Sequence, residues 1–252
     1  MPSTSTRTWL LLLLWGLVGG TAGGLSGCAP SGEPSPREGE TADLDGPAVI
    51  RAQGPESSGD AAPRVVFFGT SLTEGYGLDD PGREAWPARI GEKAHGAGLR
   101  IEVVNAGLSG ETSAGALRRV DWVVGASPPE LFILETGAND GLRGLPVEAL
   151  AENLDSIFVR TARAAPDARL ALVRMEAPPN MGAEYVEQFR KAFEEVAARR
   201  GALLLPFLLE GVAGIPELNQ PDGIHPTAEG HRQMADGVWP VLEPLLRELA
   251  GG

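Results

Sequence analysis

The chain has little cysteine, little histidine and no cluster of basic residues. Cys28 is the only cysteine among 252 residues, so no intramolecular disulfide can form. There are 21 Lys and Arg against 34 Asp and Glu, which gives a formal net charge of −13. Because nucleic acids are bound by basic faces, we expect no nucleic-acid partner. The three histidines, at positions 95, 225 and 231, are too scattered to indicate a metal site.

The N-terminal apolar stretch is short. Ten residues, WLLLLLWGLV, follow Arg7 and its neighbour, whereas a membrane-spanning helix needs about 20. A positive start, a short apolar stretch and small residues are typical of an export signal. The sequence LSGC, which ends at Cys28, resembles the lipobox of bacterial lipoproteins. The resemblance implies that residues 1–27 are a lipoprotein signal peptide; an ordinary cleaved signal with an incidental cysteine is the alternative.

The lipobox also implies where the mature protein is found. Its first residue would be a lipidated Cys28, and the lipid would anchor it to a membrane outside the cytoplasm, in the periplasm or at the cell surface. Residues 28–62 are rich in Pro, Gly, Ser, Ala and acidic residues, with almost no large apolar side chain. Such a composition cannot bury enough surface to offset the entropy of ordering. We therefore predict a flexible tether over 28–62 and one folded domain over 63–252.

Within the domain, five short apolar runs alternate with amphipathic stretches of helical length. The runs lack polar alternation, which is typical of strands buried on both faces. They are Arg64–Phe68, Ile101–Asn105, Leu131–Glu135, Arg169–Met175 and Ala202–Phe207. The helical stretches are Ala85–His95, Ser113–Val124, Val147–Ala165, Gly182–Arg200 and Thr227–Leu249; Pro240 and Pro244 are expected to bend or divide the last one. The pattern predicts an α/β protein with a three-layer, doubly wound, five-stranded parallel sheet.

The polar, glycine-rich segments follow the predicted strands. An open parallel sheet places its site outside the carboxyl ends of its strands, so these segments should meet there. They read GTSLTEGYG, NAGLSGETS, TGAND, EAPPNMG and QPDGIHPTAEGH. The first is neither a P-loop, since no lysine follows its second glycine, nor a dinucleotide fingerprint.

Acyl transfer is the chemistry that these segments favour. Ser71 needs a base to take its proton, and an imidazole, which titrates near neutral pH, suits that task. His225 can serve, with Asp222 three residues before it to orient the ring. The N–H groups of Ser71 and Gly110 and the side-chain amide of Asn139 would stabilise the oxyanion. Taken singly, each residue is also explained as a helix cap or a turn.

Together the blocks resemble the SGNH hydrolases, the GDSL-type esterase and lipase family. Ser71 in GTSL, Gly110 in NAGLSGET, Asn139 in TGAND and His225 in DGIHP match the four blocks, and Asp222 matches the triad aspartate. The likeness extends over about residues 64–248 and is greatest to the bacterial thioesterase I, lysophospholipase and arylesterase branch, through GLRG, AWPA and LLPF. One departure is Thr70, where the family usually has Asp before the nucleophile; we expect activity to be retained.

The resemblance implies a flavodoxin-like SGNH hydrolase fold and a carboxylic ester hydrolase. Small aryl esters, thioesters or lysophospholipids would be cleaved through an acyl-Ser71 intermediate, without a metal or organic cofactor. The loop with Pro178, Asn180 and Met181 is expected to bind the acyl group, or else to serve only as packing. A monomer is expected. Two alternatives stay open: a carbohydrate O-deacetylase, and a catalytically silent lipid-binding surface lipoprotein.

Overall fold

The computed structural model describes residues 49–50 and 61–251. The predicted signal peptide, the lipobox cysteine and most of the predicted tether lie outside the described residues. Within the described ranges, no helix is both long and apolar enough to cross a membrane.

The sheet has the order β1-β3-β2-β4-β5-β6. Strands β2 to β6 are parallel, which confirms the predicted five-stranded parallel sheet. Strand β1, which lies inside the range predicted as a tether, pairs antiparallel with β3 at the edge, and the sequence pattern did not predict it. The strands are β1 (Val49–Ile50), β2 (Arg64–Gly69), β3 (Glu102–Gly107), β4 (Leu131–Leu134), β5 (Arg169–Val173) and β6 (Leu203–Leu205).

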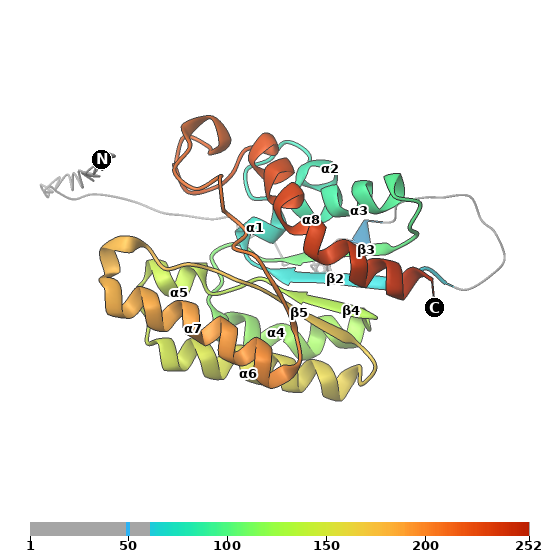
Figure 1. Cartoon of the computed structure of the whole chain (residues 1–252), viewed down its shortest axis with the longest axis horizontal. Coiled ribbons are helices and arrows are strands. Elements are labelled where there is room, and N and C mark those ends of the chain that lie inside the picture. The colour runs from blue at the N-terminus through green and yellow to red at the C-terminus, as the bar shows by residue number, and fades with distance from the viewer. Residues whose placement is uncertain (1–48, 51–60, 252) are drawn as a thin grey trace, which may run out of the picture. The chain divides into compact units, whose positions relative to one another are not determined.

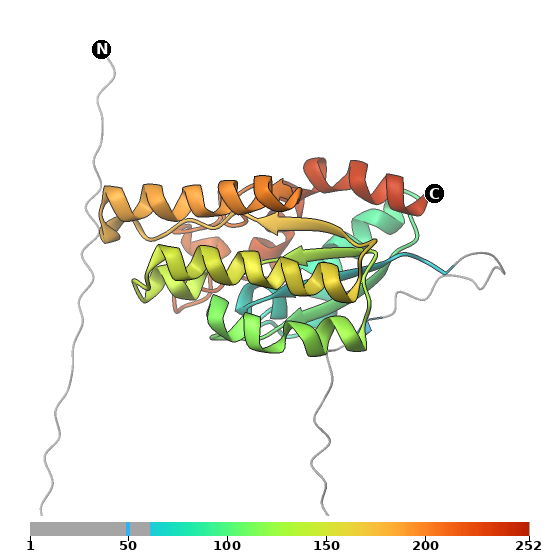
Figure 2. The ribbon, with the colours of Figure 1, turned by 90° about the horizontal axis from the view of Figure 1, so that it is seen from below.

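Helices cover both faces of the sheet, as Figures 1 and 2 show. One face carries α2 (Pro81–Glu84), α3 (Trp86–Gly96) and α8 (Ala228–Ala250). The other carries α4 (Ser113–Ala126), α6 (Val147–Ala164) and α7 (Ala183–Arg200). The short elements α1 (Ser71–Glu74), α5 (Ala138–Leu142), η1 (Pro179–Met181) and η2 (Pro216–Leu218) lie in the loops that follow β2, β4, β5 and β6.

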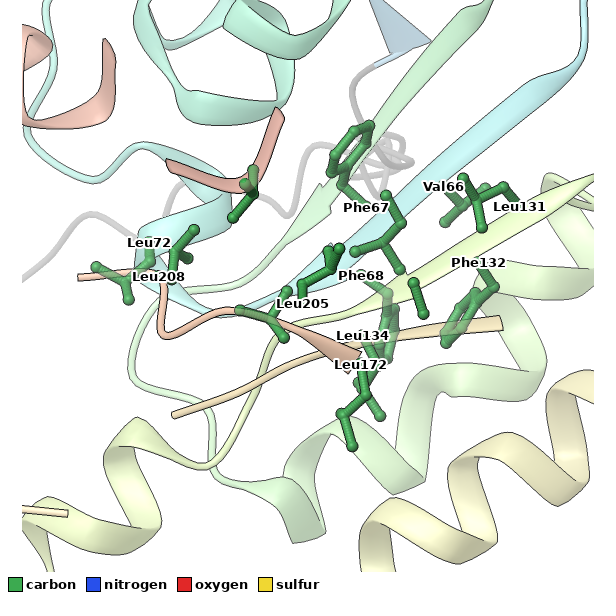
Figure 3. Close-up of a cluster of buried hydrophobic side chains, with 14 of the residues drawn as sticks. Val66, Phe67, Phe68, Leu72, Leu131, Phe132, Leu134, Leu172, Leu205 and Leu208 are labelled. Atoms are coloured by element: carbon green, nitrogen blue, oxygen red, sulfur yellow. The ribbon is translucent and has the colours of Figure 1, made fainter. Parts of the chain in front are cut away.

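The core consists of two apolar layers, one on each face of the sheet. Successive side chains of a strand point to opposite faces, and Phe67 and Phe68 of β2 do so in Figure 3. Phe67 packs edge-on against Trp86 of α3, with ring centroids 4.9 Å apart. Phe68 packs on Phe132 of β4 at 5.4 Å. The uninterrupted apolar runs of the sequence therefore correspond to strands that are buried on both faces.

Of the two outcomes predicted for the prolines of the last helix, a bend or a division, division is wrong. Helix α8 runs unbroken from Ala228 to Ala250 with Pro240 and Pro244 inside it. Each proline removes one main-chain N–H from the helix and weakens it locally. Packing against α3 and the sheet offsets that loss, because α8 buries an apolar stripe made of Met234, Val238, Leu242, Leu245 and Leu246.

Candidate active site

Ser71 lies where β2, an interior strand, turns into α1. The strand ends at Gly69, and Ser71 is the first residue of a four-residue helix that ends at Glu74 and is capped by Gly75. Gly75 has φ +82°, a left-handed conformation that favours glycine and lets the chain turn away at once. Ser71 is only 9% exposed. The sharp turn therefore presents the hydroxyl at the carboxyl edge of the sheet while its backbone stays packed.

His225 and Asp222 lie on the loop between η2 and α8, and the structure brings both to Ser71. The His225 Nε2 atom is 3.2 Å from Ser71 Oγ, and its Nδ1 atom is 2.6 Å from Asp222 Oδ2. The second carboxylate oxygen, Oδ1, accepts the N–H groups of Ile224 and His225. The hydrogen bond from the His225 ring, helped by these amides, lowers the pKa of Asp222 to about 2. The carboxylate is therefore ionised at neutral pH and faces the ring nitrogen.

Two contacts join the loop that carries His225 to the loop that carries Ser71. The Tyr76 ring lies against the His225 ring, with centroids 4.7 Å apart. The Gln220 side chain donates from Nε2 to the Tyr76 carbonyl at 2.7 Å and to the Pro226 carbonyl at 2.9 Å. Sequence reasoning did not assign a role to Tyr76 or Gln220; their proximity depends on the pairing of loops 144 positions apart.

Gly110 and Asn139 lie on the loops after β3 and β4, the two neighbours of β2. Asn139 donates from Nδ2 to the Glu111 carbonyl at 3.0 Å, and Arg143 donates to the Gly110 carbonyl at 3.0 Å. The next residue, Asp140, accepts two hydrogen bonds from Ser113 at the start of α4. The Ser113 N–H donates at 2.9 Å and the Ser113 hydroxyl at 2.6 Å. These bonds hold the two loops together at the edge of the sheet that carries Ser71.

Pro178, Asn180 and Met181 lie at the start of and within η1, after β5. Asn180 is exposed, whereas Pro178 and Met181 are half-buried. The Met181 methyl lies so close to Gly144, just after α5, that a β-carbon on that glycine would overlap it. This places η1 beside the Asn139 loop. Its part in substrate binding stays a prediction.

The other two histidines have separate surroundings. His95 is exposed on α3. His231 is 1% exposed, and its Nδ1 accepts the Trp86 N–H at 3.2 Å; burial lowers its pKa to about 4. His231 is therefore a neutral structural acceptor that joins α8 to α3. Over the described ranges, no group of three His, Cys, Asp or Glu side chains is arranged to hold a metal ion.

Glu135 is a residue whose importance the sequence analysis missed. It directly follows β4, is 0% exposed, and accepts hydrogen bonds from Thr70 and Thr73, which flank Ser71 in the sequence. The available signal was a single acidic residue that ends an otherwise apolar run, LFILE. Such a buried charge needs partners, and the sequence did not show which ones.

A serine hydroxyl that faces an imidazole, with a carboxylate behind the ring, is the arrangement typical of serine hydrolases. Here it lies at the carboxyl edge of a parallel sheet, between loops that carry amide donors. Comparison with known proteins agrees with this class.

The model of the GDSL-like Lipase/Acylhydrolase family matches residues 67–233, and the chain belongs to this family. It is 39% identical over 186 residues to "Esterase TesA" of Pseudomonas aeruginosa, a match that covers 74% of this chain and 90% of the relative. It is 34% identical over 188 residues to "Thioesterase 1/protease 1/lysophospholipase L1" of Escherichia coli, across 74% and 86% of the two chains. The protein is accordingly a carboxylic ester hydrolase.

A solved structure supports the fold. The esterase EstA from Pseudoalteromonas sp., inhibited by monoethylphosphonate, superposes with a TM-score of 0.68 at 32% identity. The match covers 73% of this chain and 99% of that one. The predicted SGNH hydrolase fold is confirmed.

Proposed function

We propose that this protein is a serine esterase that cleaves small acyl esters through an acyl-Ser71 intermediate. The observation that carries the proposal is the 3.2 Å distance from Ser71 Oγ to His225 Nε2, with Asp222 on the other side of the ring. That distance is within hydrogen-bond reach for proton transfer. The relatives' names, an esterase and a thioesterase with lysophospholipase activity, support the same class of reaction.

In the first half-reaction, His225 Nε2 takes the Ser71 proton while Oγ attacks the ester carbonyl. The C–O bond of the ester, or the C–S bond of a thioester, then breaks, and the imidazolium returns the proton to the leaving alcohol or thiol. In the second half, a water loses its proton to His225 and attacks the acyl carbonyl. The carboxylic acid leaves and Ser71 Oγ recovers the proton.

The developing oxyanion needs hydrogen-bond donors. The Ser71 and Gly110 N–H groups and the Asn139 amide are the proposed donors, because the loops after β3 and β4 flank the nucleophile at the same edge. The Asn139–Glu111 and Arg143–Gly110 bonds support this role, since they fix both loops before substrate binds. Donors held in place in this way cost no reorganisation during the reaction.

The surface around Ser71 favours an apolar acyl or aryl group. Several of the exposed large hydrophobic side chains belong to the loops at this edge: Tyr76, Leu108, Leu142 and Ile224. Exposed apolar groups beside a reactive centre are suited to cover an acyl chain or an aromatic ring. The η1 segment with Pro178, Asn180 and Met181 is proposed to extend this surface along the acyl chain. A rim in which three of these four side chains are aliphatic favours such esters over acetylated carbohydrates.

A fluorophosphonate probe tests the nucleophile directly. We expect the purified protein to form a covalent adduct at Ser71, located by mass spectrometry of the peptide, and Ser71→Ala to form none. The phosphonate inhibition of the Pseudoalteromonas esterase supports the choice of probe. The Ser109→Ala variant is the matched control and should be labelled like the wild type, since the Ser109 hydroxyl bonds Glu74 and no histidine among the described residues. Labelling that survives Ser71→Ala would overturn the proposal.

We also propose that lipid on Cys28 anchors the enzyme to an extracytoplasmic membrane, on the strength of the lipobox-like LSGC sequence. Expressed from its full-length gene in a bacterial host, the wild type should sediment with membranes. Cys28→Ser should move it to the soluble extracytoplasmic fraction or leave the signal uncleaved. A Cys28→Ser protein that fractionates and migrates like the wild type would show that the cysteine is incidental.

A further inference from the structure

The Glu135 carboxylate accepts hydrogen bonds from both threonines of the turn that precedes and begins α1. It accepts the Thr70 N–H at 2.8 Å, the Thr70 hydroxyl at 3.0 Å and the Thr73 hydroxyl at 2.8 Å. Ser71 lies between these two threonines, one residue after Thr70. The carboxylate therefore holds the nucleophile's turn from both sides.

The packing around the carboxylate is closed. Glu135 and Thr73 are both 0% exposed, and Thr70 is 1% exposed. A β-carbon on Gly69 would overlap the Thr73 hydroxyl and the Glu135 carboxylate, so only glycine fits there. The Thr73 hydroxyl also accepts a hydrogen bond from the Trp86 indole N–H. The main-chain carbonyl of Thr73 accepts one from the Asn105 side-chain amide. The turn is thus tied to α3 and β3 as well as to β4.

The charged and titratable groups of the neighbouring elements bond to other partners. Arg119 of α4 donates to the Gly69 carbonyl at 2.9 Å and to Glu111 at 2.7 Å. Glu74 of α1 accepts the Ser109 hydroxyl, and His231 of α8 accepts the Trp86 N–H. Burial raises the pKa of Glu135, and the bonds from Thr70 and Thr73 oppose that rise. Hydroxyl and amide donors, rather than a cation, thus hold this acid.

We propose that Glu135 is a positioning residue for the Ser71 nucleophile, and that the Thr70 hydroxyl is the donor through which it acts. The inference rests on the proposed function, because it assigns how the nucleophile of that reaction is held. It also accounts for the departure at Thr70. A hydroxyl donates to the buried carboxylate without adding charge, whereas a carboxyl at position 70 must carry a proton to do so.

The first test separates positioning from folding by kinetics. Thr70→Val keeps the shape but leaves a carboxylate oxygen short of a donor. We expect kcat for a short aryl ester and the rate of fluorophosphonate labelling to fall about tenfold to a hundredfold, with KM within about twofold. Thr70→Ser, which keeps the hydroxyl, should restore most of the rate. All rates are measured at least ten degrees below each variant's Tm.

Thr161→Val is the matched control. Thr161 is also a fully buried threonine, on α6, and its hydroxyl has no hydrogen-bond partner among the described residues. Its replacement should leave kcat and labelling unchanged. Equal rates for Thr70→Val and the wild type would overturn the role of the Thr70 hydroxyl, as would a Thr70→Ser variant as slow as Thr70→Val.

The second test needs no enzyme activity. In Thr70→Asp, two carboxyl groups share one buried pocket and cannot both ionise cheaply, so the pair's pKa is raised. A raised folded-state pKa contributes stability at low pH that is lost as pH rises. We expect the Tm of Thr70→Asp to fall, relative to that of the neutral isostere Thr70→Asn, between about pH 5 and pH 8.

The outcomes of the two tests are distinguishable. Parallel Tm profiles for Thr70→Asp and Thr70→Asn would overturn the carboxylate pocket, whatever the enzyme hydrolyses. If the Tm profiles of the two variants diverge but the wild-type protein fails to react with the phosphonate, the carboxylate pocket is supported and the proposed function is overturned.

Discussion

Replacing His225 with alanine is expected to abolish ester hydrolysis almost as completely as replacing Ser71. The imidazole is the only base within hydrogen-bond reach of the Ser71 hydroxyl in the described part of the chain, at 3.2 Å. Without it the hydroxyl keeps its proton and attacks slowly. In serine hydrolases that depend on such a pair, loss of either partner costs roughly 10⁶ in kcat. The measurement is kcat for a short aryl ester near neutral pH, with thermal unfolding to show that each variant is folded.

The double variant makes this prediction sharper. In the proposed mechanism Ser71 and His225 act as one unit, so Ser71→Ala with His225→Ala should be no slower than either single variant. His95→Ala is the matched control, since it removes an exposed histidine on α3, and it should keep the wild-type rate. A His225→Ala enzyme within about tenfold of the wild type would show that another group takes the proton.

Replacing Asp222 with asparagine is expected to lower kcat by about 10³–10⁴, with little change in KM. The carboxylate accepts the His225 Nδ1 proton at 2.6 Å, so it holds the tautomer that leaves Nε2 free to face Ser71. An asparagine can turn its NH₂ toward Nδ1 and select the wrong tautomer. The Asp222 side chain is 41% exposed, so water can partly replace its hydrogen bond to the ring. We therefore expect a smaller loss of kcat than for the removal of His225.

The pH dependence gives a second readout of Asp222. Its pKa is lowered to about 2, chiefly by the hydrogen bond from His225. It therefore stays ionised across the assay range, so Asp222 should add no ionisation of its own to the acid limb of kcat/KM. Asp167→Asn, in the exposed turn before β5, is the matched control and should leave both the rate and the limb unchanged. A rate loss under tenfold for Asp222→Asn would contradict its orienting role.

Much of the fold could be predicted because it depends on local pattern. Apolar runs without alternation, such as Leu131–Glu135, identified strands that are buried on both faces. The carboxyl-end rule then placed Ser71 and His225 at one edge, although they are 154 positions apart. The edge strand β1 was missed because two residues in a polar, Pro-rich segment are too few to show the alternation of a strand. Helix α8 was expected to bend or divide because proline propensity is local, while the packing that keeps it whole is not.

The sequence by itself determined which reactive groups are available. They are a serine after a buried strand and a histidine three residues after an aspartate, together with glycines that allow tight turns. Only the tertiary structure decided which groups meet. It set Tyr76 against His225, Asn139 against Glu111, and Glu135 beneath Thr70. The physical reason is that a residue's type states which bonds it can make, whereas the partner of a buried carboxylate depends on how strands distant in sequence align in the sheet.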